Sequence, residues 1–402
     1  MTTAPPTLPA RPRRVFVTVA EVSGDRHAAQ LIRALRETDP TIQVEGHGGP
    51  EMAAAGATIH RETVGNAAMG WRGALRSAEI YGVLKWTRRH FDQNPPDLQI
   101  GVDSPSMNFH FARAAKERGV PVFQYVAPQL WAWAEWRMKK LRRWVDHVAC
   151  ILPFEEEYFR RRGVNATFVG HPLFDELPPH RDPPPPGERF PNKPPVIGLL
   201  PGSRKSVAAA NFPGLFEAAR WIRSEFGDVS FLVPTTAATH DVVAGWVEGH
   251  AGRGLGPDSF TIQRDAFDDL VPRCDLCLTV SGTATLHVAG YNVPMIVVYH
   301  GNPVLWHAVG RWLIKIPTRT LVNLLAAGPG ATAEQHLTPE FTPWYGSAEP
   351  VAHLAIDYLR HPQKLEDQRA KLDALVRSLD KPGASANAAR IALQVMNRGN
   401  GA

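Results

Sequence analysis

Residues 98–126 read LQIGVDSPSMNFHFARAAKERGVPVFQYV, and this stretch decides the fold. An apolar strand over 98–102 stops at an acid, Asp103. A helix follows and ends at Gly119, and a second apolar strand covers 120–126. Strand, helix and strand in this order predict a βαβ unit of a parallel sheet. Ligands of such sheets bind at the carboxyl ends of the strands, so Asp103 is a candidate to contact one.

The pattern continues on both sides of this unit. Gln129 follows the strand over 120–126, a third strand is expected over 147–152, and His171 follows Gly170. We expect Asp103, Gln129 and His171 to line one cleft, because each comes directly after a strand.

An earlier strand is expected over 15–20, and it runs into Glu21, Ser23 and Gly24 before a helix. A glycine-bearing turn at this place brings backbone N–H groups close to a ligand. The alternative is an ordinary turn capped by Ser23 or Asp25. Glu21 favours the functional interpretation, because an acid at the carboxyl end of a strand points into the crevice.

The second half of the chain repeats the pattern after a proline-rich segment, LPPHRDPPPPGERFPNKPP over 177–195. Such proline density predicts a stiff linker. A strand over 196–200 then runs into Gly202, Ser203 and Arg204, where a guanidinium suits phosphate oxygens. A later strand, 276–280, ends in a small-residue turn over 281–283 that suits a diphosphate at a helix start.

Composition limits the class of protein. A length of 402 residues suggests about two to three domains, and 44% hydrophobic residues suffice for a packed core. A net charge of +5 does not indicate nucleic-acid binding. Three cysteines argue against a disulfide framework, and Cys274 and Cys277 lack a second pair for zinc. No metal cluster, signal peptide or membrane-spanning run is predicted.

Two segments combine tryptophan with basic residues, as membrane-interface helices do. One is expected over 71–91 and the other over 131–146. The candidate lipid contacts are Trp86, Trp131, Trp133, Trp136, Arg137 and Lys140. The alternative is a pair of ordinary domain helices with tryptophan inside and bases outside.

Several motifs together resemble the lipid-A-disaccharide synthase family. They are AEVSGD over 20–25, GVD over 101–103, YVAPQLWAW over 125–133, ILPFE over 151–155, FVGHP over 168–172, LPGSRKS over 200–206 and SGTATL over 281–286. The resemblance implies an inverting, metal-independent glycosyltransferase of the GT-B architecture, with two Rossmann-like parallel-sheet domains across a cleft. It implies transfer of 2,3-diacylglucosamine from UDP to 2,3-diacylglucosamine 1-phosphate, which gives the β-1,6 lipid A disaccharide 1-phosphate and UDP.

The resemblance also implies roles for residues. Asp103 is the expected base, with Glu21 as the alternative. The expected donor-binding set is Gly202, Ser203, Arg204, Ser281, Gly282, Thr283, His287, Asn323 and Glu334. The expected acceptor or hinge set is Ser23, Gly24, Gln129 and His171. Several positions depart from the family pattern. Ala20 replaces Gly, Ser106 replaces an acid, and His287 replaces a Glu that typically receives ribose hydroxyls, while Val322 and Ala333 each replace a Pro.

The expected organisation is a disordered tail over 1–14, an acceptor and lipid domain over 15–177, a linker over 178–195, a donor domain over 196–350, and terminal helices over 351–402 that cross back to the first domain. No cofactor and no nucleic acid are expected. The expected location is the cytoplasmic face of the inner membrane, and a homodimer is left open. The alternatives are another UDP-amino-sugar transferase or epimerase, or a non-catalytic lipid or nucleotide-sugar binding relative.

Overall fold

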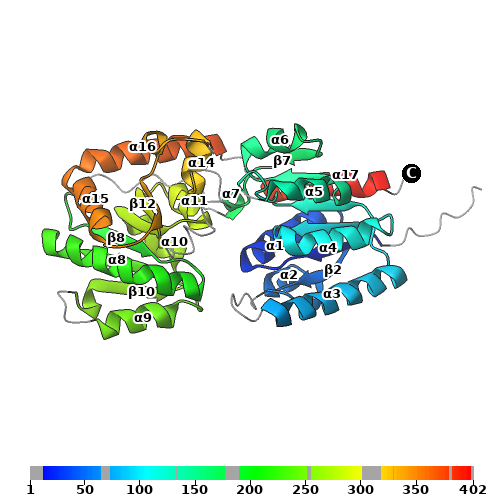
Figure 1. Ribbon diagram of the computed structural model, residues 1–402, viewed down its shortest axis with the longest axis horizontal. Coiled ribbons are helices and arrows are strands. Elements are labelled where there is room, and N and C mark those ends of the chain that lie inside the picture. Colours follow the sequence, from blue (N-terminus) through cyan, green and yellow to red (C-terminus); the bar gives the residue numbers. More distant parts are fainter. Residues whose placement is uncertain are drawn as a thin grey trace, which may run out of the picture. The chain divides into compact units, whose positions relative to one another are not determined.

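The computed structural model describes residues 12–64, 73–132, 134–176, 190–250, 255–300, 318–328, 330–379 and 383–399. Most of the predicted tail and linker, and Trp133, lie outside these residues. Contacts divide the chain into two units, Met1–Glu176 with Lys381–Ala402, and Leu177–Asp380. Each unit is built on a parallel sheet of its own (Figure 1).

Unit 1 has a seven-stranded sheet in the order β3-β2-β1-β4-β5-β6-β7. The strands are β1 Arg14–Thr18, β2 Gln43–Gly48, β3 Thr58–Glu62, β4 Leu98–Val102, β5 Val122–Tyr125, β6 His147–Cys150 and β7 Ala166–Phe168. The helices are α1 Val22–Thr38, α2 Pro50–Ala54, α3 Gly73–Gln93, α4 Pro105–Lys116, the short 3-10 helix η1 Glu135–Arg137, α5 Met138–Trp144, α6 Pro153–Arg160, α7 Leu173–Glu176 and α17 Ala384–Gly399.

The alternation of side chains along β1 explains how helices cover this sheet. Val15 and Val17 pack in one core with residues of α1 and α17. Phe16, between them in sequence, packs in a second core with residues of α3, α4 and α5. Successive side chains of a strand point to opposite faces, so an apolar run such as β1 requires helices on both faces.

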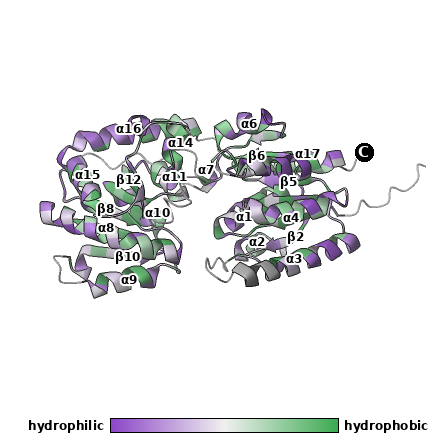
Figure 2. Cartoon of the chain, viewed as in Figure 1, coloured by the Kyte–Doolittle hydropathy of each residue, from purple (hydrophilic) through white to green (hydrophobic). Residues whose placement is uncertain are grey.

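Unit 2 has a six-stranded sheet in the order β10-β9-β8-β11-β12-β13. The strands are β8 Val196–Leu200, β9 Ser230–Thr235, β10 Phe260–Arg264, β11 Leu276–Val280, β12 Met295–His300 and β13 Glu340–Trp344. The helices are α8 Lys205–Phe226, α9 His240–Gly249, η3 Pro257–Ser259, α10 Phe267–Leu270, η4 Val271–Arg273, α11 Thr283–Gly290, α14 Leu321–Ala327, η6 Ala333–Gln335, α15 Glu349–Arg360 and α16 Pro362–Leu379. Figure 2 shows largely apolar strands between helices with polar outer faces.

The terminal helices differ from the expectation for residues 351–402. Helix α15 packs on α8, and α16 packs on α11 and α15, so both stay in unit 2. Only α17 packs in unit 1, chiefly on α1. The apolar positions of α15, including Val351, Ala355 and Leu359, complete the core of unit 2, and this burial holds the helix there.

The tryptophan-rich segment is also less helical than predicted over 131–146. Helical backbone begins only at Glu135, and Ala134 before it has a left-handed φ of 60°. Left-handed backbone cannot continue a right-handed helix. The helix therefore cannot extend through Ala134 toward Trp131. Among the described residues, no helix combines the length and apolar character needed to cross a membrane.

Candidate functional site

The turn between β4 and α4 is strained at two successive residues. Asp103 has φ of 50° and Ser104 has φ of 39°, which is left-handed backbone in residues that carry a Cβ atom. Such conformations cost of order 1–3 kcal/mol each and persist only where the surroundings fix them. Strain of this kind concentrates at functional sites, so the turn that begins at Asp103 is a candidate site.

Hydrogen bonds to the backbone hold this turn in place. The Asn108 amide donates to the carbonyl oxygens of Val102 at 3.0 Å and Asp103 at 2.7 Å. Gln124 donates to the same Asp103 carbonyl at 3.2 Å, and the Asp103 N–H donates to the Tyr125 carbonyl at 3.0 Å. Because both backbone groups of Asp103 are bonded, the direction of its Cα–Cβ bond is fixed.

Thr18 of β1 and Gln99 of β4 support Asn108, one of the two side chains that hold this turn. The Thr18 hydroxyl donates to Asn108 Oδ1 at 2.8 Å, and Gln99 Nε2 donates to the Thr18 hydroxyl at 3.1 Å. Thr18, Gln99 and Asn108 are all buried. Gly101 makes room for the amides, since an added Cβ would lie 2.8 Å from Gln124 Oε1. A buried network of hydrogen bonds of this kind makes a local conformation rigid, although Gln99 Oε1 has no partner among the described residues.

Glu21 and Gly24 belong to the same end of the sheet. An added Cβ at Gly24 would lie 3.9 Å from Asp103 Cβ and 2.7 Å from a methyl of Val19, so only glycine allows this close approach. Burial raises the pKa of the Asp103 carboxyl above its ordinary value, the Ser104 N–H opposes that rise, and the negative charge of Glu21 adds to it. Asp103 is thus a partly buried carboxylate beside a second, exposed one, an arrangement suited to proton transfer.

Asp25, in the same sequence motif, has a structural task. It is 1% exposed, and its carboxylate accepts the N–H groups of Gly49 at 2.9 Å, Glu51 at 3.0 Å and Met52 at 3.3 Å. These donors begin α2, where free N–H groups favour an acidic partner. Ser23 is exposed, and it makes no side-chain cap of α1, which begins after Glu21.

His171 is buried and His27 is partly buried in unit 1, and the two rings lie close enough for their charges to interact. Burial lowers the pKa of His171 to about 3, with a further contribution from His27. Burial likewise lowers the pKa of His27 to about 4. His171 Nδ1 accepts the Leu173 N–H at 3.2 Å, so the proton of the neutral ring resides on Nε2. Among the described residues, that Nε2 has no hydrogen-bond partner. The sequence predicted His171 but missed His27, which follows Ser23 by one helical turn.

Gln129 is exposed in the loop after β5. Trp131 is not free for a ligand, because its Nε1–H donates to Glu155 Oε1 at 3.0 Å. Glu155 is 1% exposed, and its burial raises the pKa of this carboxyl to about 8, although hydrogen bonds oppose the rise. Trp131 and Glu155 therefore join the loop to the start of α6.

In unit 2, two turns lie at the carboxyl ends of neighbouring strands. Leu200 of β8 pairs with Thr279 of β11, so the turn over 202–204 and the turn over 281–283 are adjacent. Gly202 has φ of 101°, and Gly282, which has φ of 157°, has open space where a Cβ would lie. Arg204 is exposed, and no described residue pairs with it. Open backbone and an unpaired guanidinium suit an anion.

His287 has partners of its own on α11 and α10. Its Nε2 lies 2.9 Å from Asp268 Oδ1, and the Tyr291 hydroxyl donates to the same oxygen at 2.9 Å. The rings of Phe267 and Tyr291 lie 4.5 and 5.4 Å from the imidazole. The histidine thus takes part in a local cluster around Asp268.

Asn323 is a correction to the donor-binding set. It is 0% exposed, and its amide donates to the Thr338 carbonyl at 2.9 Å and to Glu340 Oε2 at 3.0 Å. Its Oδ1 accepts the N–H and hydroxyl of Thr338 at 2.8 and 3.2 Å. No bonding capacity is left for a ligand. Asn323 instead positions Glu340, whereas Glu334 is exposed in η6.

Known proteins of one family match this chain over nearly its whole length. The family model of Lipid-A-disaccharide synthetase matches residues 15–394. A lipid-A-disaccharide synthase of Geobacter metallireducens is 34% identical over 389 residues, which cover 96% of this chain and 98% of the relative. The chain belongs to the lipid-A-disaccharide synthase family. It is therefore a glycosyltransferase, as the sequence motifs predicted.

Solved structures confirm the predicted fold class of this synthase-family chain. MurG of Acinetobacter baumannii aligns with a TM-score of 0.57 and 16% identity, covering 95% of this chain and 100% of that one. A UDP-GlcNAc 2-epimerase of Neisseria meningitidis bound to UDP-GlcNAc aligns with a TM-score of 0.55 and 11% identity, covering 96% and 99%. Two parallel-sheet domains of GT-B type are thus shared with transferases and epimerases.

The tryptophans expected at a lipid surface have different environments in this synthase-family chain. Trp86 is partly buried and stacks on His90 with the ring centroids 4.8 Å apart, so only part of its surface is exposed. Trp131 is held by Glu155 as described above. Trp136 is 65% exposed, and the Arg137 guanidinium lies 5.9 Å from its ring. Lys140 is exposed, with its ammonium 5.9 Å from the Trp144 ring.

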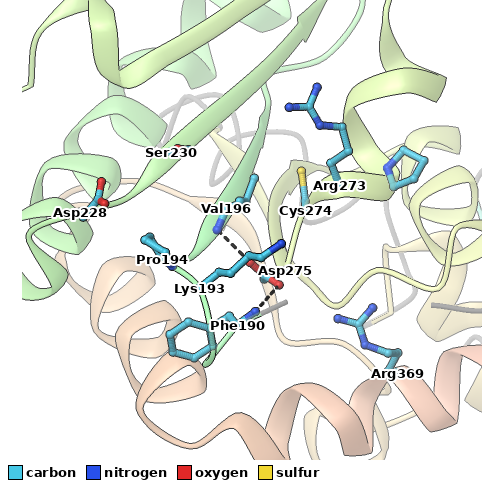
Figure 3. A pocket seen from close by; sticks show the side chains of 11 residues that line it. Phe190, Lys193, Pro194, Val196, Asp228, Ser230, Arg273, Cys274, Asp275 and Arg369 are labelled. Carbon is cyan, nitrogen blue, oxygen red and sulfur yellow. Dashed lines mark hydrogen bonds between the residues drawn. The ribbon is translucent and has the colours of Figure 1, made fainter. Parts of the chain in front are cut away.

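A hollow of about 220 Å³ in unit 2 lies away from these turns (Figure 3). Asp275, in its wall, accepts the N–H groups of Phe190 at 3.3 Å and Val196 at 2.9 Å. Val196 begins β8 and Asp275 precedes β11, so the hollow lies at the amino ends of the strands. Sugar-nucleotide chemistry in a synthase-family chain belongs to the opposite, carboxyl ends.

Proposed function

We propose that Asp103 is the general base of the family's reaction, the transfer of 2,3-diacylglucosamine from UDP to the 6-hydroxyl of 2,3-diacylglucosamine 1-phosphate. The observation that carries the proposal is the clamped, strained turn of Asp103, because a base must be held in a fixed direction to take a proton. A raised pKa makes its carboxylate a better proton acceptor. The attacking oxygen forms the new bond to the anomeric carbon, and UDP departs with the electron pair.

Glu21 is assigned the second carboxylate role in this proposal. Its charge raises the pKa of Asp103, and its exposed position at the start of α1 leaves it free to contact the acceptor sugar. We also assign Gln129 and His171 to binding of the acceptor sugar. The buried Nε2–H of His171 has no described partner and would donate to a ligand oxygen.

The departing UDP needs positive charge and N–H donors near its diphosphate. In our proposal these come from Arg204 and from the N–H groups of the turns over 202–204 and 281–283. The exposed guanidinium supports this role, because it has no described partner that would compete with phosphate. His287 and Glu334 are assigned to the nucleoside part of the donor, and Asn323 is withdrawn from the binding set.

The test is product analysis by mass spectrometry. Purified chain is mixed with UDP-2,3-diacylglucosamine and 2,3-diacylglucosamine 1-phosphate, and the expected product is the β-1,6 disaccharide 1-phosphate with one UDP per disaccharide. An epimerised UDP-sugar without disaccharide would favour the epimerase alternative. Binding of both substrates without any product would favour a non-catalytic relative.

We also propose that the surface formed by Trp136, Arg137 and Lys140 rests on an anionic membrane. An exposed tryptophan beside an exposed lysine and a neighbouring arginine suits the headgroup region of a bilayer. Such contact would bring the chain to its acylated substrates at the cytoplasmic face of the inner membrane. Several other bases of this region are already paired, including Arg118 with Asp92 and Lys116 with Asp146, so they contribute less.

Sedimentation with vesicles tests the membrane proposal. Trp136→Ala and Lys140→Glu should each reduce binding to vesicles that contain phosphatidylglycerol, with little change on purely zwitterionic vesicles. Trp221→Ala and Lys371→Glu are the matched controls, because Trp221 is 44% exposed and Lys371 is exposed, both in unit 2. Equal losses for test and control variants would contradict the assignment of this surface.

A further inference from the structure

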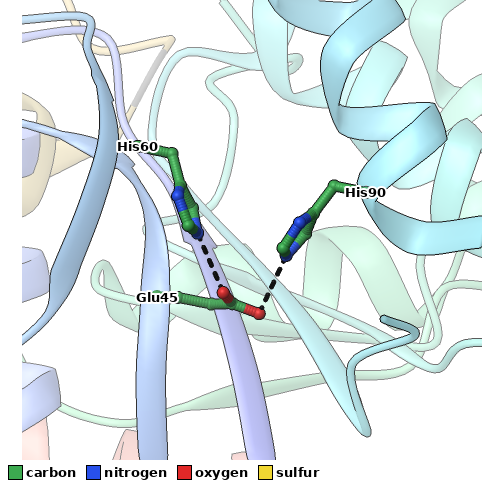
Figure 4. Close-up of side chains that lie close together, drawn as sticks. All are labelled: Glu45, His60 and His90. Carbon is green, nitrogen blue, oxygen red and sulfur yellow. Dashed lines mark hydrogen bonds and ion pairs between the residues drawn. The ribbon is translucent and has the colours of Figure 1, made fainter. Parts of the chain in front are cut away.

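Three potential metal ligands converge on the α3-covered side of the unit 1 sheet (Figure 4). His60 Nε2 lies 2.8 Å from Glu45 Oε2, and His90 Nε2 lies 3.2 Å from Glu45 Oε1. One ligand atom from each residue lies within 4.8 Å of the other two. Glu45 is on β2, His60 on β3 and His90 on α3, so three regular elements supply one ligand each.

The ligand types and spacing suit zinc. Zinc binds histidine nitrogen and carboxylate oxygen at roughly 2.0–2.2 Å with tetrahedral geometry, which places neighbouring ligand atoms roughly 3.3–3.6 Å apart. The His60 Nε2–Glu45 Oε2 distance of 2.8 Å therefore needs only a small outward movement when a metal replaces the ring proton, and the third ligand atom, from His90, already lies within 4.8 Å of the other two. Two histidines and one carboxylate leave a fourth position for water.

Aromatic packing fixes the planes of both imidazoles in advance. The Trp86 ring stacks on His90 at 4.8 Å with 11° between the planes. Phe16 stacks on His60 at 6.2 Å, also with 11° between the planes. The side chains of Glu45 and His90 are each 13% exposed, and that of His60 is 22% exposed, so the cluster is shielded but reachable. Metal sites depend on such outer contacts to orient their ligands.

Arg14 bears on the site in two ways. Its guanidinium donates to Glu45 Oε1 at 2.6 Å and thereby leaves Oε2 as the oxygen that faces His60. A ligating carboxylate commonly has such a hydrogen-bonded neighbour. The guanidinium also neutralises Glu45, so the competing interpretation is a metal-free cluster in which both histidines donate to the carboxylate.

We propose that Glu45, His60 and His90 form a zinc-binding site that joins β2, β3 and α3. The site lies away from the strand-end turns and has no part in sugar transfer, so its failure would leave the proposed function intact. No metal cluster was predicted from the sequence, because residues 45, 60 and 90 share no short spacing motif and only the fold brings them together.

The test is calorimetric titration of the full, tag-free chain with zinc chloride near neutral pH. The wild-type chain should bind one zinc ion, and His60→Gln and His90→Gln should each weaken binding by at least about tenfold. A glutamine amide can still donate to Glu45 but is a poor zinc ligand, so these variants preserve the metal-free hydrogen bonds. His361→Gln, at an exposed histidine of unit 2, is the matched control and should bind zinc as the wild type does.

A second measurement keeps the proposal open to refutation if a variant folds poorly. Cobalt(II) should give the strong visible absorption of a four-coordinate site in the wild-type chain. Melting temperatures with and without zinc should show stabilisation of the wild type and none for His90→Gln. Absence of saturable zinc binding by the wild type, or binding unchanged in both histidine variants, would overturn the proposal and leave the metal-free cluster.

Discussion

The turn after β4 and the turn after β8 each follow a central strand of their own sheet, yet they are built differently. The turn at Asp103 has two strained residues, and Asn108 and Gln124 hold its backbone through hydrogen bonds. The turn at Arg204 is open, its side chain is exposed, and Gly202 supplies the left-handed backbone without strain. A group that must accept a proton in one direction needs rigidity, whereas a group that neutralises a diphosphate can adjust to it.

The largest effect should come from the rigid turn. Asp103→Asn keeps the shape of the side chain and removes its ability to take a proton, so turnover should fall by about 10²–10⁴. Disaccharide formation is the measurement, with UDP affinity and melting temperature expected to stay near wild-type values. Asp39→Asn, at the far end of α1, is the matched control and should retain full turnover. Near-normal turnover of a well-folded Asp103→Asn would move the base to Glu21, to be tested with Glu21→Gln.

A substitution in the open turn after β8 should have a smaller effect, and that effect should be on UDP affinity. Arg204→Ala removes a charge-assisted contact worth about 1.5–3 kcal/mol, which corresponds to roughly 10- to 150-fold in UDP affinity. Calorimetric titration with UDP measures it, and Lys205→Ala supplies a neighbouring exposed cation as control. Equal losses for the two variants would show that general positive charge, rather than the Arg204 fork, holds the diphosphate.

One buried carboxyl group in each unit, Glu155 and Glu340, should affect how the free energy of unfolding depends on pH. Burial raises the pKa of Glu155 from 4.5 to about 8 in unit 1. Burial also favours a higher pKa for Glu340 in unit 2, but hydrogen bonds from Thr342, Asn323, Thr320 and Arg319 outweigh it and lower that pKa. The unfolded chain therefore releases the Glu155 proton near pH 4.5, while the folded chain keeps it to about pH 8. The free energy of unfolding should fall as pH rises through this window.

Glu155→Gln should flatten this alkaline decline, because an amide does not titrate and its oxygen can still accept the Trp131 N–H. Melting temperatures between pH 5 and pH 9 provide the measurement. Glu340→Gln is the contrasting variant: it should lose stability near neutral pH and keep the alkaline decline. An unchanged pH profile in Glu155→Gln would mean that this carboxyl is already ionised in the folded chain.

The smallest effect is expected at His287. A glutamate there would meet the carboxylate of Asp268, which lies 2.9 Å from the imidazole, so the family residue is best restored together with Asp268→Asn. One added hydrogen bond to the donor ribose is worth about 0.5–1.5 kcal/mol, and the double variant should bind UDP up to roughly tenfold more tightly. A collapse of affinity in the double variant, with Asp268→Asn alone unaffected, would give His287 a binding role of its own.

The sequence predicted the sheets and the placement of Asp103 because both depend on local patterns. Apolar strands of five or six residues and an acid at a strand end can be read without knowing the neighbours. Strands β3 and β13 were missed, since they are short and their residues are largely half-buried or exposed. The boundaries of the Trp131–Asp146 helix failed because a side-chain bond to Glu155 and one left-handed residue decide the local backbone.

Long-range contacts explain the rest of what the sequence could not give. Asn323 matches a family motif, but whether its amide faces a ligand or the protein depends on Thr338 and Glu340, which lie 15 and 17 residues away. The clamp on Asp103 depends on Thr18, 90 residues from Asn108. No spacing rule predicts such pairs, because the topology of the sheet brings them together.

The packing of α17 in unit 1 has a consequence for the chain while it is being synthesised. Asp175 accepts N–H groups from Gly383, Ala384 and Ser385, and the first of these partners follows it by 208 residues. The core around α1 also includes Ala388, Ala392 and Met396 of α17. At synthesis rates of about 5–20 residues per second, that apolar face stays uncovered on the ribosome for roughly 10–40 s. All residues of unit 2 are therefore synthesised before α17 can complete the core of unit 1, although the strands of unit 1 are made first.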